Sequence, residues 1–309
     1  MDTIQQFITN NFFFFTLFLF LFGACVGSFL NVCIYRLPEE GKSVVKPRSC
    51  CPSCSTLIRW YDNIPIFSYI ILHGRCRKCD AQISPQYIII EIFIGYLFVE
   101  FFILFCLSAQ YVAYLYLTCS LLVVAIIDFR FFIIPDEISF AGMIVGCLLS
   151  LFFPTLQGTS KHLIGFSYAL IGLVVGGGMI YLTGVIGDAI FKKESMGGGD
   201  VKLMAMIGAF LGWKYAVLTF FLAPFFGAIV GLYVKFVQKK DIIPYGPFLS
   251  FAALLSLFAG DPIIKRIIGD VTLSPWVIIG IFFGIVIGLL LIWLLIKIII
   301  DLVIKKKHK

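Results

Sequence analysis

The sequence is poor in charged residues, which make up 13% of the 309 residues, whereas hydrophobic residues make up 61%. A soluble domain carries about 25% charged residues, so this composition excludes an ordinary soluble globule. Histidine is also scarce: the three histidines, His73, His162 and His308, form no ligand spacing and support no catalytic triad. The first eleven residues contain no Lys or Arg, and no small-residue cleavage site follows the first apolar stretch. We therefore expect that stretch to remain as a helix rather than to be removed as a signal peptide.

Long apolar runs recur along the whole sequence, and the mean hydropathy is +1.03. Several runs are long enough to cross roughly 30 Å of hydrocarbon as helices. The predicted fold class is all-α, a polytopic membrane helix bundle with eight or nine transmembrane helices and a small cytoplasmic insert. The candidate spans are 12–34, 86–108, 111–127, 138–153, 163–187, 201–213, 215–237, 247–262 and 276–300.

The distribution of Lys and Arg predicts the orientation of these spans, because basic residues gather in cytoplasmic loops. We attribute the net charge of +7 to this bias, rather than to nucleic-acid binding. Segment 35–85 holds eight Lys or Arg residues and should face the cytoplasm. With nine spans, 20 of the 24 basic residues fall on that side, which places the N-terminus outside and the C-terminus inside. The other four are Lys161, Lys214, Lys265 and Arg266.

Five of the ten cysteines lie in the hydrophilic insert, where two C-x-x-C pairs are separated by 21 residues. This spacing is close to that of a structural zinc site with four thiolate ligands. We expect the ligands to be Cys51, Cys54, Cys76 and Cys79, with Cys50 left over. A redox-active pair and a chance arrangement are the alternatives, while a reducing cytosol disfavours a disulfide framework.

Two aspartates lie at the ends of predicted membrane helices, where an ionisable residue is a functional candidate. Asp128 ends the third span, and Asp200 opens the sixth after the run Gly197-Gly198-Gly199. Two neighbouring carboxylates can share one proton, so that one activates water while the other donates to a scissile carbonyl. Glycines lack a Cβ and would let an extended substrate approach Asp200. The alternatives are that Asp128 pairs with Arg130 and that Asp200 is a helix N-cap.

Two further acidic positions have simpler interpretations. Asp136 follows Ile134-Pro135 just before the fourth span, with Ser139 three residues later, which is typical of a helix cap. Glu91 lies inside the second span, near its cytoplasmic end, and is expected to pair with buried polar groups or to line a cavity.

The motifs, in their order along the chain, resemble the bacterial type IV prepilin peptidases, which are leader peptidases and N-methyltransferases of the GxGD aspartic protease group. The resemblance covers about residues 23–262. It rests on an ordered set of segments: Gly27-Ser28-Phe29-Leu30-Asn31, Tyr35-Arg36-Leu37-Pro38, Cys51-Pro52-Ser53-Cys54, Asn63-Ile64-Pro65, Gly74–Cys79, Ile83-Ser84, Tyr87, Glu91, Asp128, Ile134-Pro135-Asp136, Met196–Leu203 and Ile243–Phe248.

The resemblance implies that Asp128, rather than Asp136, is the catalytic partner of Asp200. It also implies that Gly197, Gly199, Lys202 and Asp136 support the substrate or its loop, and that Cys51, Cys54, Cys76 and Cys79 bind zinc. S-adenosylmethionine is the implied methyl donor, although no glycine-rich nucleotide loop is visible. The implied partners are type IV prepilins or pseudopilins and the lipid bilayer, with no nucleic acid, at the bacterial inner membrane. The residues leave the oligomeric state and the methyl-donor site open.

We therefore expect four regions: a first transmembrane helix (1–34), a cytoplasmic zinc-binding insert associated with methyl transfer (35–85), a peptidase bundle (86–262) and an additional helix with a basic tail (263–309). The additional helix departs from the family pattern, which commonly ends after eight spans. Two alternative functions remain: a peptidase without methyltransferase activity, and a non-enzymatic transporter or assembly factor that uses its carboxylates for ion coupling.

Overall fold

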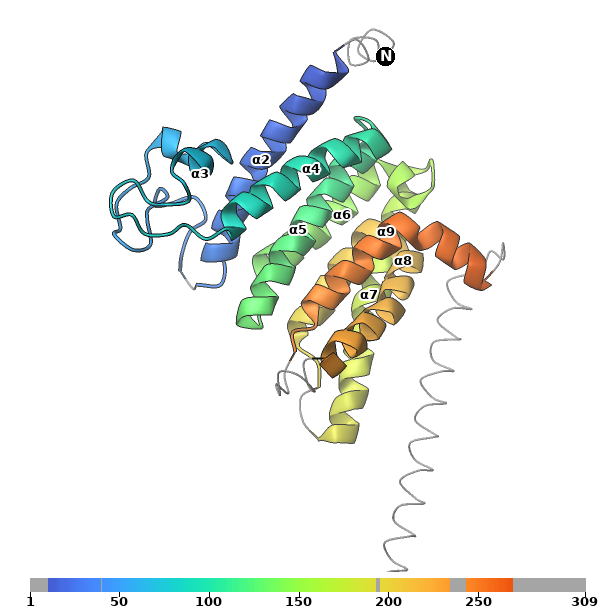
Figure 1. Cartoon of the computed structure of the whole chain (residues 1–309). Helices are drawn as coiled ribbons and strands as arrows, with labels where there is room; N and C mark the ends of the chain where they lie inside the picture. The colour runs from blue at the N-terminus through green and yellow to red at the C-terminus, as the bar shows by residue number, and fades with distance from the viewer. Residues whose placement is uncertain (1–10, 40, 193–194, 234–242, 269–309) are drawn as a thin grey trace, which may run out of the picture. The chain divides into compact units, whose positions relative to one another are not determined.

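The structure is a computed structural model, and it describes residues 11–39, 41–192, 195–233 and 243–268 (Figure 1). Contacts between residues divide the chain into two units, Met1–Gly260 and Asp261–Lys309. Apart from the end of α9, the features discussed below lie in the first unit. The predicted ninth span at 276–300 and the basic tail lie outside the described residues.

All regular elements in these ranges are helices, as the composition predicts. They are α2 (Phe12–Arg36), η1 (Trp60–Asn63), α3 (Phe67–Ile71), α4 (Gln86–Phe105), α5 (Ala109–Phe131), α6 (Asp136–Phe152), η2 (Pro154–Gln157), α7 (His162–Phe191), α8 (Gly198–Tyr233) and α9 (Gly246–Ile268). Each long helix begins within three residues of the start of a predicted span. Helix α8 covers two of the predicted spans.

Five described helices are long and apolar enough to cross a bilayer: Phe12–Arg36, Gln86–Phe105, Ala109–Phe131, His162–Ile190 and Gly198–Gly231. A shorter apolar helix covers Gly246–Asp261. Several such helices in one chain indicate a multi-pass membrane protein. The total of eight or nine crossings stays a prediction.

Helix α8 contains a break that turns it into two antiparallel halves. Gly212 has φ 76° and ψ 171°, which is far from helical geometry. Asp200 and Tyr245 line one cavity, and Gly227 also approaches Tyr245. Both halves of α8 therefore approach the same segment before α9, so the chain runs away from this edge and returns to it. The two spans predicted at 201–213 and 215–237 correspond to these halves.

The side chain of Gln157, the last residue of η2, occupies the break. The side-chain amide of Gln157 donates to the carbonyl oxygens of Ala209 (3.3 Å) and Phe210 (3.2 Å). These carbonyls precede the break, where regular helical partners are lost. Gln157 thereby satisfies backbone acceptors that would be costly to leave unpaired inside a membrane.

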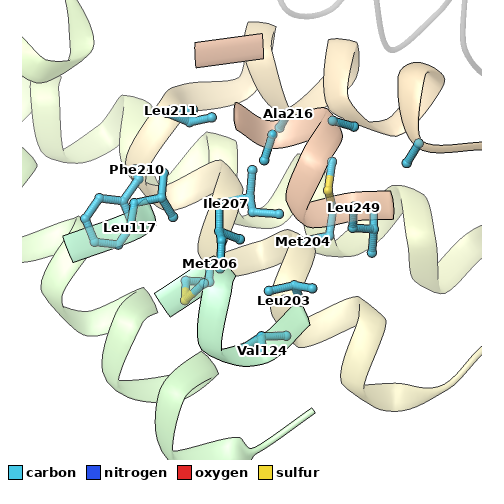
Figure 2. Close-up of a cluster of buried hydrophobic side chains, with 14 of the residues drawn as sticks. Leu117, Val124, Leu203, Met204, Met206, Ile207, Phe210, Leu211, Ala216 and Leu249 are labelled. Atoms are coloured by element: carbon cyan, nitrogen blue, oxygen red, sulfur yellow. The ribbon is translucent and has the colours of Figure 1, made fainter. Parts of the chain in front are cut away.

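The largest buried cluster joins α5, α8 and α9 and fixes the relation between them (Figure 2). Its members are fully or nearly fully buried, and they include Leu117, Val124, Leu203, Met204, Ile207, Phe210 and Leu249. A second cluster packs α2 against α4 and α5. Between α7 and α8 the backbones approach closely, because a Cβ on Gly172 or Gly208 would meet the backbone of the other. Small residues permit this close packing of membrane helices.

Candidate active site and metal centre

Asp128 lies in the last turn of α5. The helix ends where Phe132 adopts the left-handed conformation (φ 58°) and its N–H bonds to the Asp128 carbonyl. The Asp128 residue is only 6% exposed, and its Oδ2 accepts a hydrogen bond of 2.8 Å from the N–H of Gly246. The first residue of α9 therefore fixes the orientation of this carboxylate.

Asp200 lies in the first turn of α8, with its backbone N–H bonded to the Gly197 carbonyl (3.1 Å). The segment before it is tethered to α7, because the N–H and hydroxyl of Ser195 both donate to Asp188 Oδ1, at 2.7 and 2.5 Å. The helix begins at Gly198, so Asp200 is inside it and is not an N-cap.

The structure brings the two aspartates together. Asp128, Asp200, Phe132 and Gly197 line two adjoining cavities of about 270 and 390 Å³. The two carboxylates are also close enough to interact electrostatically. Two residues that are 72 positions apart in the sequence thus share one partly open site.

A third wall of the site comes from the segment before α9. Ile243, Pro244 and Tyr245 line the larger cavity. Burial, and secondarily the negative charge of Asp200, raise the pKa of the Tyr245 phenol. Its hydroxyl therefore stays protonated at neutral pH and can donate a hydrogen bond. The motif from Ile243 to Phe248 is visible in the sequence, but no role for Tyr245 or for the Gly246 N–H was predicted from it.

The predicted role of the glycine run is divided between its members. A Cβ on Gly199 would meet the Ile134 side chain, so this glycine is required for packing. A Cβ on Gly198 would meet nothing within 4 Å, and one on Gly197 would lie 3.5 Å from Oδ2 of Asp200, at ordinary van der Waals distance. Gly198 therefore leaves open space, while Gly197 lines both cavities next to the Asp200 carboxylate.

Asp136 does not act as a helix cap, which corrects the sequence-based interpretation. The N-cap of α6 is Pro135, and Asp136 is the first residue of the helix. Its carboxylate instead forms an ion pair with Lys202, whose Nζ donates to both oxygens at 2.7 and 2.8 Å. Lys202 and Asp136 thus join the first turns of α6 and α8 beside the smaller cavity.

The predicted alternative of an Asp128–Arg130 pair is also not formed. Arg130 bonds instead to the side chain of Gln86, the first residue of α4. The start of α4 and the end of α5 therefore lie at the same edge of the bundle as Asp128. Because segment 35–85 leads directly into α4, the cysteine insert joins the bundle at this edge.

The insert is built on two matching turns, one around each C-x-x-C pair. The N–H of Cys51 bonds to the Thr56 carbonyl, and the N–H of Cys76 bonds to the Ala81 carbonyl, five residues ahead in both turns. Ser55 and Asp80 each follow the second cysteine and each have a positive φ, of 54° and 58°. Both turns therefore hold their sulfurs in the same local geometry.

The four predicted ligands converge, with their Sγ atoms all within 4.8 Å of one another. The Cys51 and Cys79 sulfurs are 3.8 Å apart. Four sulfurs at about 2.3 Å from a tetrahedral zinc ion would be separated by about 3.8 Å, so the cluster fits this metal. Hydrogen bonds with the Thr56 hydroxyl and N–H lower the pKa of Cys54 to about 6, whereas burial and hydrogen bonds with the other three thiols raise the pKa of Cys79. Cys50 is exposed and is not a member of the cluster.

Comparison with known proteins gives two matching family profiles. Residues 21–105 match the bacterial peptidase A24 N-terminal domain, and residues 115–232 match the type IV leader peptidase family. No solved structure matches.

Three similar curated proteins are all named prepilin leader peptidase/N-methyltransferase. The protein from Myxococcus xanthus is 38% identical over 71% of this chain and 62% of its own length. The protein from Stutzerimonas stutzeri is 33% identical over 84% of this chain and 96% of its own length. The protein from Pseudomonas putida is 31% identical over 78% and 89% of the two chains. The chain therefore belongs to the type IV leader peptidase family.

Proposed function

We propose that this chain cleaves the leader peptide of type IV prepilins or type II secretion pseudopilins and then N-methylates the new N-terminal residue. Membership of the family and the names of its relatives support this activity. The geometric support is the shared site of Asp128 and Asp200, which lies open at one edge of an otherwise apolar bundle. An aspartic peptidase needs two carboxylates that share one site.

Asp128 and Asp200 share a proton in this mechanism. The ionised carboxylate takes a proton from water, and the protonated one donates to the carbonyl oxygen of the scissile bond. The Gly246 N–H holds Asp128 in place, and the cavities lined by Gly197 admit the extended substrate backbone. Lys202 and Asp136 hold the two helix ends that flank the smaller cavity.

The test is to replace each aspartate by asparagine and to incubate the purified protein with a prepilin. Either Asp128→Asn or Asp200→Asn should lower the cleavage rate by about 10²–10⁴-fold, the usual contribution of general acid–base catalysis. Glu100→Gln is the matched control, because Glu100 is a membrane-helix carboxylate that bonds to Tyr96 on α4 and does not line either cavity. Normal processing by either asparagine variant would refute the assignment.

The insert supplies the second part of the proposed function. Its four cysteines would hold a structural zinc ion that organises the two turns, and the insert contributes to methyl transfer from S-adenosylmethionine. The mass of the cleaved product, with and without S-adenosylmethionine, decides this point. A product that lacks the leader and never gains a methyl group would identify a peptidase without methyltransferase activity.

The proposed topology has eight or nine crossings at the bacterial inner membrane, with the insert and the aspartates at the cytoplasmic face. The proposed regions are 1–34, 35–85, 86–262 and 263–309. A thiol reagent that does not cross the membrane would test the orientation. It should label Cys50 in inverted vesicles, which expose the cytoplasmic face, and not in right-side-out vesicles. Labelling from the outer side would contradict it.

A further inference from the structure

The short helix α3 in the insert exposes apolar side chains in an arrangement that a water-soluble domain would not be expected to show. Phe67, Ile70 and Ile71 lie on one face at helical spacing, and they are 53%, 60% and 67% exposed. The polar Ser68 is buried instead, where its hydroxyl donates to the Tyr61 carbonyl (2.9 Å). The amphipathic pattern is therefore the reverse of that expected for a helix facing water.

A partly buried contact determines where this helix lies along α4. The N–H of Ile66, at the start of α3, donates to Glu91 Oε2 at 2.8 Å. Glu91 is five residues into α4, which is about 7.5 Å from the start of that membrane helix at 1.5 Å per residue. The 20 residues of α4 span about 30 Å, the thickness of the hydrocarbon core. The bond to Glu91 places the start of α3 against α4 (Figure 1).

This depth matches that of an interfacial helix, whose apolar face is buried about 5–10 Å below the headgroups. We infer that α3 is inserted into the cytoplasmic leaflet and that Phe67, Ile70 and Ile71 contact acyl chains. The lipid-facing surface of α4 thus continues onto the insert, and Glu91 is the anchor between them.

The polar groups of the segment suit this environment. The N–H groups of Ser68, Ile70 and Leu72 bond to the carbonyls of Ile64, Ile66 and Ser68, so the backbone is satisfied within the turn. Trp60, on the neighbouring turn η1, is 74% exposed, and tryptophan is favoured at the membrane–water boundary. Segment 35–85 carries eight Lys or Arg against four Asp or Glu, which favours anionic headgroups.

Site-specific photo-crosslinking in lipid nanodiscs tests the inference without any activity measurement. A benzophenone amino acid replaces Phe67 in one full-length variant and Ile71 in another, and mass spectrometry detects phospholipid adducts. The control position is Val45, which is 75% exposed in the same insert but lies outside α3. We expect at least about tenfold more lipid adduct at both α3 positions than at Val45.

Equal lipid adduct at all three positions, or none at Phe67 and Ile71, would overturn the inference. Adducts to an added prepilin that replace the lipid adducts would also overturn it, and would make this face a substrate-binding surface. Both replaced side chains are largely exposed, so neither variant removes a core contact. The bound zinc of each sample reports that the insert has folded.

Discussion

The aspartate site and the cysteine insert are stabilised in different ways, although they lie at the same edge of the bundle. Asp128 and Asp200 are carried by long helices whose apolar side chains form a large buried cluster. In the described part of segment 37–85, by contrast, only Cys51, Ser68 and Gly74 are buried. Helix packing therefore positions the aspartates, whereas the insert has almost no core and depends on its ligand-forming turns.

Replacement of one cysteine ligand should show most strongly that the insert and the aspartate site are stabilised in different ways. Cys51→Ser is expected to unfold the insert, because a structural zinc ion contributes about 10–16 kcal/mol to folding in small metal-dependent domains. Bound zinc and methylation should be lost, while leader cleavage continues. Zinc content, limited proteolysis of the insert and the mass of the product measure the three effects.

Cys50→Ser is the matched control, since Cys50 is an exposed neighbour outside the cluster. It should keep zinc and both activities. Loss of cleavage in Cys51→Ser would show that the two regions are not separable.

The opposite test disturbs the aspartate site and leaves the insert intact. The change is Gly246→Ala in the bundle. A Cβ at this position would meet the Asp128 carboxylate, so Asp128 must move. Misplacement of a catalytic group by about 1 Å can cost about 10²-fold in rate, and we expect a fall in cleavage of this size with zinc binding unchanged. Steady-state kinetics on a prepilin substrate measures it.

Gly178→Ala is the control for that change, because a Cβ there meets nothing within 4 Å. Cleavage by Gly246→Ala within twofold of the parent rate would contradict the role of the Gly246 contact.

A smaller effect is expected at the break in α8. Gln157→Glu keeps the shape of the side chain but removes the amide donor from the carbonyls of Ala209 and Phe210. Unsatisfied buried groups of this kind cost about 1–3 kcal/mol, so the thermal unfolding midpoint in detergent should fall. Thr155→Ala, at an exposed position in the same turn, should leave the midpoint nearly unchanged. Equal midpoints for the two variants would show that Gln157 does not stabilise the break.

The smallest effect is expected at the Lys202–Asp136 ion pair. Both side chains are partly exposed, and such pairs contribute about 0–1 kcal/mol. Lys202→Met or Asp136→Asn alone should therefore lower kcat/KM for cleavage no more than about fivefold. If the two residues act only through each other, the double variant should have a kcat/KM no lower than that of the less active single variant. A far larger loss in either single variant would give that residue a direct part in the reaction.

Much of the fold can be predicted from the sequence, because membrane helices follow from continuous apolar runs. Within the described residues, the structure places helices at the predicted spans, and it brings together Cys51, Cys54, Cys76 and Cys79 as their spacing predicts. Their fit to zinc rests on local turns, which the C-x-x-C spacing already implies.

The surroundings of the aspartates could not be predicted in the same way. The N–H of Gly246 is 118 positions from Asp128, and no local pattern links a backbone donor to a distant carboxylate. Asp136 resembles a helix cap in the sequence, and only the approach of α8 reveals Lys202 as its partner. The same applies to Glu91, whose bond to Ile66 depends on the path of the insert.

Composition and motif order alone thus determined the membrane class, the family resemblance and the identity of the candidate residues. These properties depend on residue type and short spacing. Tertiary structure decided which groups meet: the shared cavity of Asp128 and Asp200, the separate roles within the glycine run, and the bond that joins the start of α3 to Glu91. Contacts between distant segments depend on how whole helices pack, and packing energy is spread over many apolar side chains that are interchangeable in sequence.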